Sequence, residues 1–243
     1  MGAETVLVVG VLAFATSALT AVLGFGGGVV LLAMLLTVVD PLVAIPLHAA
    51  IQVVSNGTRT IVRRRDVDWR VVGWTSVLLL PAGALTLPLA QRAPEAALQA
   101  LIAIAVLAAT WLPERLDRPL RPPTRRGWLG LGALLGALNP VVGATGPLAA
   151  PFLRAGTRDR LGFVGTFAAS QVVGHAVKLV LFGSVGLLPF AQAPVAAVGI
   201  VGVVAGTWVG SRVLDRMPER RFDRLYLAAI TLIAGWLLID AFL

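Results

Sequence analysis

The chain has 243 residues, of which 58% are hydrophobic and only 13% are charged, and its mean hydropathy is +0.89. Soluble globular domains carry about a quarter charged residues, so this composition excludes a soluble protein and predicts an all-α, polytopic membrane protein. The net charge of +8 comes from arginines in short segments beside apolar runs. That placement is typical of membrane topology rather than of nucleic-acid binding.

Apolar segments follow one another along the whole chain in two sets of five. The first set covers residues 5–23, 29–39, 42–62, 71–90 and 95–112. The second set covers residues 127–138, 147–153, 161–183, 187–210 and 225–242. We therefore expect one transmembrane domain made of a first repeat (1–112), a Pro- and Arg-rich cytoplasmic linker (113–126) and a second repeat (127–243). Each repeat should hold a glycine- or proline-broken helix pair and three transmembrane helices.

The two sets are related in sequence as well as in pattern. An offset of 119 residues aligns 18–62 with 137–181 without a gap. The matched identities include glycine and polar pairs, which are Gly24 with Gly143, Gly27 with Gly146, Asp40 with Asp159 and Gln52 with Gln171. Matches of polar and glycine residues at one offset indicate an internal repeat.

Arginine placement predicts the orientation of the helices. Four zones hold 18 of the 20 Lys and Arg residues, at 59–70, 115–126, 154–160 and 212–224. The positive-inside rule places all four zones in the cytoplasm. Each glycine-broken pair then leaves and returns on the same side of the membrane. The two halves are therefore expected to be inverted in a cell (inner) membrane, with both termini external.

Glycines interrupt an apolar segment once in each half, in "LGFGGGVV" and in "NPVVGATGP". The free N–H groups and the positive dipole end of a restarting helix favour an anion, and such breaks are typical of secondary transporters. We expect these breaks and the polar residue before each to contact substrate, with tight packing of small residues as the alternative. The candidate residues are Thr20, Gly26, Gly27, Gly28, Asn139, Gly143, Thr145 and Gly146.

Polar side chains lie near the centre of two matched apolar segments. Gln52 and Gln171 are either substrate ligands or an interhelical hydrogen bond, and both readings stay open. One turn later come Asn56 and its matched residue His175. His175 would bind an anion or carry a coupling proton, or else act as a neutral hydrogen-bonding group.

The only lysine, Lys178, stands alone in an apolar run and matches Arg59. An intramembrane cation indicates a functional site, so Lys178 is a candidate for attracting an anion, with snorkelling as the alternative. Arg59 adjoins a cytoplasmic arginine cluster, for which topology is a sufficient explanation. His48 has less support, because its matched residue is Phe167.

The sequence gives little support for a catalytic site or a metal site. Asp40 and Asp159 each precede a long helix and are expected to be N-caps. With no cysteine and two histidines, we expect neither a metal site nor a cofactor. No phosphate-binding loop motif is present, and Ser170 and His175 do not share a helix face, so we expect no enzyme activity.

The glycine cluster of "LGFGGGVVLLAMLL", the segment "HAAIQVVSNGTRTIVRRRDVDW" and the second copy "NPVVGATGPLAAPFLRAGTRDRLGFVGTFAASQVVGHAVKLV" together resemble the TauE/SafE family. This resemblance implies a permease for small sulfur-containing anions such as sulfite or sulfoacetate. Many relatives carry a proline shortly after the glycine cluster, where this chain has "VVLLAMLL".

The expected function is therefore the export of a small sulfur-containing anion by alternating access. The expected partners are that anion and the lipid bilayer. A coupling proton and a second copy of the chain are optional partners. Two alternatives stay open: a proton-coupled importer of a related anion, and a membrane subunit that transports nothing.

Overall fold

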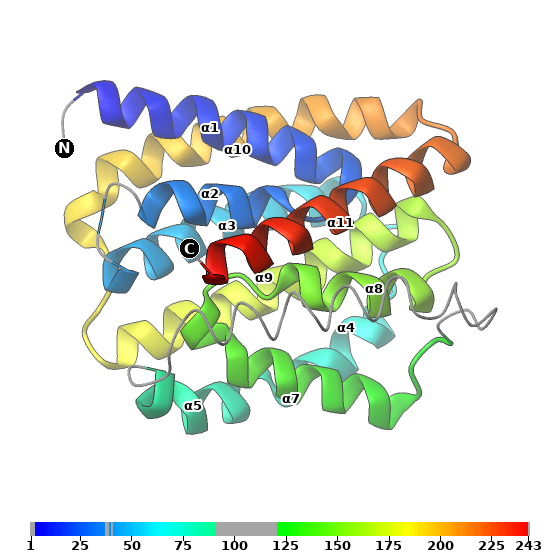
Figure 1. Ribbon diagram of the computed structural model, residues 1–243, viewed down its shortest axis with the longest axis horizontal. Coiled ribbons are helices and arrows are strands. Elements are labelled where there is room, and N and C mark those ends of the chain that lie inside the picture. Colours follow the sequence, from blue (N-terminus) through cyan, green and yellow to red (C-terminus); the bar gives the residue numbers. More distant parts are fainter. Residues whose placement is uncertain (1–2, 37–38, 40, 91–120, 243) are drawn as a thin grey trace.

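The computed structural model describes residues 3–36, 39, 41–90 and 121–242 (Figure 1). This part of the chain is helical and contains no strand. Its α-helices are α1 (Ala3–Leu23), α2 (Gly27–Leu36), α3 (Pro41–Val62), α4 (Trp69–Ser76), α5 (Leu79–Ala90), α7 (Arg125–Val142), α8 (Gly146–Gly156), α9 (Arg160–Ser184), α10 (Ala193–Asp215) and α11 (Glu219–Phe242). A short 3-10 helix, η1 (Phe190–Gln192), precedes α10.

Several helical stretches are long and apolar enough to cross a bilayer. In the described part these are Val6–Leu23, Trp69–Pro88, Arg160–Ser184 and Phe190–Asp215. A span of the hydrocarbon core needs about 20 residues, so the multi-pass helical fold expected from composition is confirmed. The apolar segment 95–112 and the linker up to residue 120 lie outside the described residues.

Helix boundaries agree with the offset of 119 residues between the halves. α1 ends at Leu23 and α7 ends 119 residues later at Val142. α2 and α8 begin at the matched glycines Gly27 and Gly146, and α9 begins 119 residues after α3. This agreement supports the repeat, while the inverted relation of the halves and their domain boundaries stay predictions.

The two halves interlock rather than lie apart. α3 and α9 pack together at the centre, with α1 against α10 on one side and α5 against α7 on the other (Figure 1). Each outer pair therefore takes one helix from each half. The central pair α3 and α9 carries the polar side chains that the sequence singles out.

Three glycines on α10 allow α1 to approach closely. They are spaced by four residues, at Gly202, Gly206 and Gly210. A Cβ atom built on Gly206 would lie 2.2 Å from the carbonyl oxygen of Phe14. A stripe of small residues is the usual way for membrane helices to pack without a hydrophobic driving force between them.

We expect Gly206→Ala to destabilise the protein by roughly 1–3 kcal/mol, because the added methyl group forces the α1 and α10 backbones apart. Thermal unfolding of the purified protein in detergent measures this effect. Gly130→Ala is the matched control, since no atom lies within 4 Å of a Cβ built there in α7. Equal unfolding temperatures for the two variants would contradict this account of the packing.

Ion pairs join arginines and acidic residues from separate zones of the sequence at the ends of several helices. Arg63, at the end of α3, pairs with Asp215 at the end of α10. Ion pairs also tie the end of α8 and the start of α9 to the start of α11: Arg154 with Glu219 and Asp223, and Arg160 with Glu219. This arrangement supports a single basic face, and its location in the cytoplasm stays a prediction.

Asp159 caps α9 as expected, because its Oδ1 accepts a hydrogen bond of 2.8 Å from the Gly162 N–H. An N-cap of this kind satisfies one of the free N–H groups of the first turn. Its matched residue Asp40 lies outside the described residues.

Candidate functional site

The first break lies slightly earlier than the sequence suggests. Gly24 and Gly26 have positive φ angles of 88° and 97° and separate α1 from α2. Gly27 and Gly28, expected to belong to the interruption, instead form the first turn of α2. Positive φ is what only glycine adopts without strain, so the pair Gly24 and Gly26 makes the break.

Gly27 and Gly28 allow α2 to lie close to neighbouring helices, and neither residue has a positive φ angle. A Cβ atom on Gly27 would lie 1.9 Å from the Thr16 carbonyl oxygen. A Cβ atom on Gly28 would lie 2.7 Å from Nε2 of Gln52. The start of α2 is therefore pressed against both α1 and the central helix α3.

The second break repeats this geometry. Gly143 has a φ of 70° and ends α7, and α8 restarts at Gly146 with Pro147 in its first turn. Proline suits this position because the first N–H groups of a helix have no intrahelical partner. α2 and α8 are thus two short helices that begin inside the protein.

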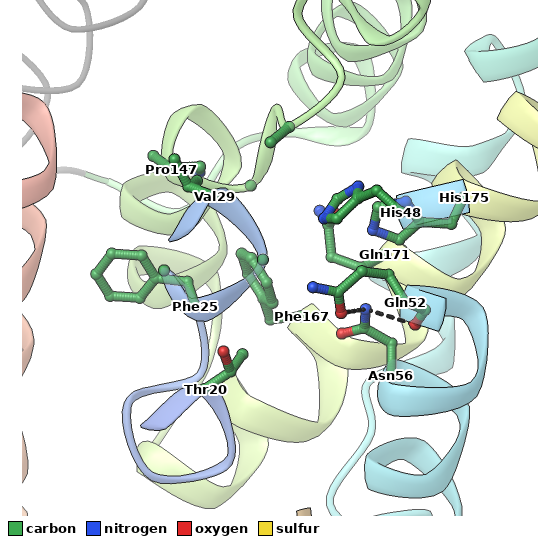
Figure 2. A pocket seen from close by; sticks show the side chains of 14 residues that line it. Thr20, Phe25, Val29, His48, Gln52, Asn56, Pro147, Phe167, Gln171 and His175 are labelled. Atoms are coloured by element: carbon green, nitrogen blue, oxygen red, sulfur yellow. Dashed lines mark hydrogen bonds between the residues drawn. The ribbon is translucent and has the colours of Figure 1, made fainter. Parts of the chain in front are cut away.

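One cavity lies between the two helix starts (Figure 2). α2 and the break before it contribute Phe25, Gly26, Gly28 and Val29, and the second break contributes Ala144, Gly146 and Pro147. The space open to the centre of a water molecule is about 30 Å³. The positive ends of two helix dipoles and their free N–H groups therefore border one small cavity.

Apart from Thr20 of α1, the remaining wall of the cavity comes from matched faces of α3 and α9. Each helix contributes three residues spaced by four, so that each set shares a helix face. The lining residues are His48, Gln52 and Asn56 on α3, and Phe167, Gln171 and His175 on α9. Each residue of the second set is 119 positions after its counterpart in the first.

Asn56 holds Gln52 in place within this wall. Its Nδ2 donates to the carbonyl oxygen of Gln52 at 2.9 Å and to Oε1 of the same residue at 3.4 Å. Figure 2 shows the Gln52 amide nitrogen pointing away from Asn56 toward the break. That N–H group is thus oriented as a donor to a ligand in the cavity.

The two histidines meet across the interface of α3 and α9. Their rings lie edge to face, with centroids 5.3 Å apart and an interplanar angle of 78°. Both side chains are buried, and neither nitrogen of His48 nor Nδ1 of His175 has a hydrogen-bond partner in the described part of the chain. Buried polar atoms are normally paired, so these nitrogens are available to a ligand.

Two cations lie one turn beyond the cavity-lining faces, at the matched positions Arg59 and Lys178. Both side chains are 0% exposed. Arg59 donates to Asn56 Oδ1 at 3.1 Å and to Ser55 Oγ at 3.4 Å, and Lys178 Nζ donates to the Gly143 carbonyl oxygen. Among the described residues, no carboxylate pairs with either cation, so the interior beside the cavity carries uncompensated positive charge.

Of the thirteen residues proposed from sequence, eight line this cavity. They are Thr20, Gly26, Gly28, Gln52, Asn56, Gly146, Gln171 and His175. Asn139 and Thr145 instead line a second cavity of about 20 Å³, which also borders Gln171. Gly27, Gly143 and Lys178 line neither cavity, and the last two are joined by the hydrogen bond from the ammonium group to the carbonyl.

Thr20 and Asn139 occupy matched positions but differ in environment. Thr20 lines the main cavity while its Oγ1 donates to the Thr16 carbonyl oxygen at 2.8 Å. Asn139 Nδ2 donates to the Gly174 carbonyl oxygen at 2.8 Å, across to α9. The longer amide side chain reaches the neighbouring helix, whereas the threonine hydroxyl bonds back to its own helix.

The sequence analysis gave His48 less support than its matched neighbours and left out the apolar part of the lining. The signal for His48 was its position four residues before Gln52, which places the two on one helix face. Phe167 has the same signal relative to Gln171. Phe25, Val29, Ala144 and Pro147 carry no chemical signal, because they line the cavity only through the position of the two breaks.

Comparison with known proteins places the chain in a family. The sequence model described as "Sulfite exporter TauE/SafE" matches residues 9–237, nearly the whole length. No curated protein and no solved structure gave a significant match. The matched region contains both breaks, the cavity and the basic end of the helices. The chain therefore belongs to the TauE/SafE sulfite exporter family, a family of membrane transporters.

Proposed function

We propose that this protein is a secondary transporter that exports a small sulfur oxyanion of the size of sulfite by alternating access. The anion binds in the cavity between the starts of α2 and α8. The observation that carries this proposal is the positive charge around the cavity: two helix N-termini border it, two buried cations lie one turn beyond its lining, and no described carboxylate lines it.

Hydrogen-bond donors in the cavity suit an oxyanion. Gln52 and Gln171 offer amide N–H groups, and the first turn of α2 offers backbone N–H groups. The imidazole N–H of His48 or His175 adds a further donor. An oxyanion accepts several such bonds at once, whereas a metal cation or Na⁺ would need oxygen ligands that this wall supplies only from amide groups.

The size of the cavity favours a small substrate. A volume of about 30 Å³, measured at the centre of a water-sized sphere, holds roughly two water molecules. Sulfite is close to that size, whereas taurine and sulfoacetate carry an additional two-carbon arm. We therefore expect sulfite to bind more tightly than either organosulfonate.

Membrane potential supports the export direction. A potential that is negative inside drives an anion outward with about 2.3 kcal/mol per charge per 100 mV. At equal concentrations on the two sides, uniport of sulfite out of the cell is therefore downhill without a coupling ion.

A binding and flux experiment tests the proposal. Purified protein is titrated with sulfite, thiosulfate, sulfate, sulfoacetate and taurine while thermal stability is measured, and sulfite efflux from proteoliposomes is followed at several imposed potentials. We expect stabilisation by sulfite first, and efflux that accelerates as the interior becomes more negative. No stabilisation by any of the anions, or a flux indifferent to potential, would contradict the proposal.

The unpaired histidine nitrogens favour a second candidate, a proton-coupled importer of the same anion. In that case His48 and His175 would carry the coupling proton beside the anion. Counterflow with and without an imposed pH gradient separates the candidates, because only the importer accumulates anion in response to an acidic exterior. A protein that binds a partner but transports nothing would show neither response.

Gln52→Leu and Gln171→Leu should each weaken sulfite binding by about tenfold to a hundredfold. Each change removes an amide donor from the cavity, and the loss of a hydrogen bond to a charged group costs roughly 1.5–3 kcal/mol. Titration of each purified variant measures the loss. Ser170→Ala is the control, because Ser170 neighbours Gln171 in sequence but lines the second cavity. Affinity unchanged in both leucine variants would assign the glutamines to helix packing.

A further inference from the structure

A third and much larger pocket lies at the basic end of the protein, apart from the two cavities described above. It is formed where α10 ends and α11 begins. Its lining consists of three arginines and three apolar residues, which are Arg212, Arg216, Arg221, Val209, Val213 and Met217. The space open to the centre of a water molecule is about 420 Å³.

The arginines of this pocket have no carboxylate partner among the described residues. The acidic residues of the same region are engaged elsewhere. Asp215 pairs with Arg63 of α3, and Glu219 and Asp223 pair with arginines of α8 and α9. The pocket therefore keeps its positive charge, which an external anion can neutralise.

One side of the pocket is apolar and faces outward. Val209 and Val213 are 41% and 47% exposed, on a stretch long and apolar enough to cross the membrane. Trp208 is exposed on the same helix, and the guanidinium of Arg212 lies 3.3 Å from the centre of its ring. This stacking holds Arg212 at the boundary between the cationic and the apolar surface.

We propose that this pocket binds an anionic phospholipid. The phosphodiester lies among Arg212, Arg216 and Arg221, and an acyl chain runs along Val209 and Val213. Guanidinium groups bind phosphate in bidentate fashion, and basic pockets beside membrane helices on the cytoplasmic side suit lipid headgroups. Arginines that served topology alone would need neither a shared pocket nor an adjoining apolar surface.

Two double variants that each remove two arginine charges, one inside the pocket and one outside it, test this proposal. The pocket variant is Arg216→Gln with Arg221→Gln. The control is Arg220→Gln with Arg224→Gln, which removes the same amount of charge from exposed residues at the start of α11 that do not line the pocket. Binding of phosphatidylglycerol and of phosphatidylcholine with the same acyl chains is measured on the full-length protein in detergent by native mass spectrometry and by thermal stabilisation.

We expect wild-type protein to bind phosphatidylglycerol in preference to phosphatidylcholine. The pocket variant should bind phosphatidylglycerol about thirtyfold more weakly, from about fivefold for each arginine near a phosphate, and the control should bind it like wild type. Glycerol phosphate and inorganic phosphate, tested alone, should stabilise the protein far less, because they lack the acyl chain.

Several results would overturn the proposal. Equal binding of the two lipids by wild-type protein would remove the headgroup contact. If lipid binding weakened equally in the pocket variant and in the control, the effect would come from general surface charge and not from the pocket. Equal stabilisation by inorganic phosphate would make the pocket a phosphate site rather than a lipid site. If the double pocket variant does not fold, Arg221→Gln alone should show about a fivefold loss, and no loss there would count against the proposal.

Discussion

Lys178→Met should weaken sulfite binding by at least about thirtyfold, because it removes a fully buried positive charge beside the cavity. Lys178 follows the cavity-lining residue His175 by three positions on α9, so its charge lies about one helical turn from the site. Its ammonium group also donates to the carbonyl oxygen of Gly143, which ends the helix before the second break. Titration of the purified variant with sulfite measures the change.

The stability of the variant without ligand separates a binding role from a structural one. A buried cation without a carboxylate partner is costly, so its replacement by methionine should leave the unfolding temperature unchanged or raise it. If Lys178 only held the second break together, the variant would unfold at a lower temperature and keep its affinity. Arg59→Met should act in the same direction, and Arg64→Met, at an exposed position, is the control.

Gly28→Ala should reduce sulfite binding by about a hundredfold or more. The added Cβ atom would lie 2.7 Å from Nε2 of Gln52, so either the amide or the start of α2 must move. The cavity of about 30 Å³ has little room for such a shift, and the substituted turn carries the N–H groups that we propose bind the anion. Affinity from titration and sulfite efflux from proteoliposomes should fall together.

The control for this change is Gly57→Ala on α3. No atom lies within 4 Å of a Cβ built on Gly57, and the residue is helical. Alanine is favoured over glycine in a helix by about 1 kcal/mol, so this variant should be as stable as wild type or more stable, with unchanged affinity. An alanine at Gly28 that binds sulfite like wild type would contradict the placement of the anion.

Much of the candidate site could be predicted from the sequence, because the internal repeat identifies residues that occupy equivalent positions in the two halves. The offset of 119 residues pairs Gln52 with Gln171, and helical spacing then extends the same faces to Asn56 and His175. These residues lie together because matched helices α3 and α9 pack face to face at the centre. Sequence periodicity predicts such a face without any knowledge of the partner helix.

The position of the first break could not be predicted to the residue. Three consecutive glycines in "FGGG" suggest an interruption at Gly26–Gly28, yet positive φ falls at Gly24 and Gly26. The reason is tertiary: Gly27 and Gly28 are needed where α2 contacts Thr16 and Gln52. A glycine that permits a turn and a glycine that permits contact look identical in a sequence.

The packing of helices from one half against helices of the other half also could not be predicted from the sequence. The spacing of the glycines at positions 202, 206 and 210 is typical of a packing face, but it does not indicate that α1 of the other half occupies that face. The roles of Thr20 and Asn139 diverge for a similar reason, since the asparagine finds a carbonyl oxygen on α9 within reach. Contacts between halves depend on the path of the chain in space.

A structure of the protein with bound selenite, a heavier analogue of sulfite, would locate the anion directly. We expect selenium between the starts of α2 and α8, with its oxygen atoms within hydrogen-bond distance of Gln52 and of the α2 backbone. Selenium found only at another site, or a cavity that stays free of selenite at saturating concentration, would contradict it.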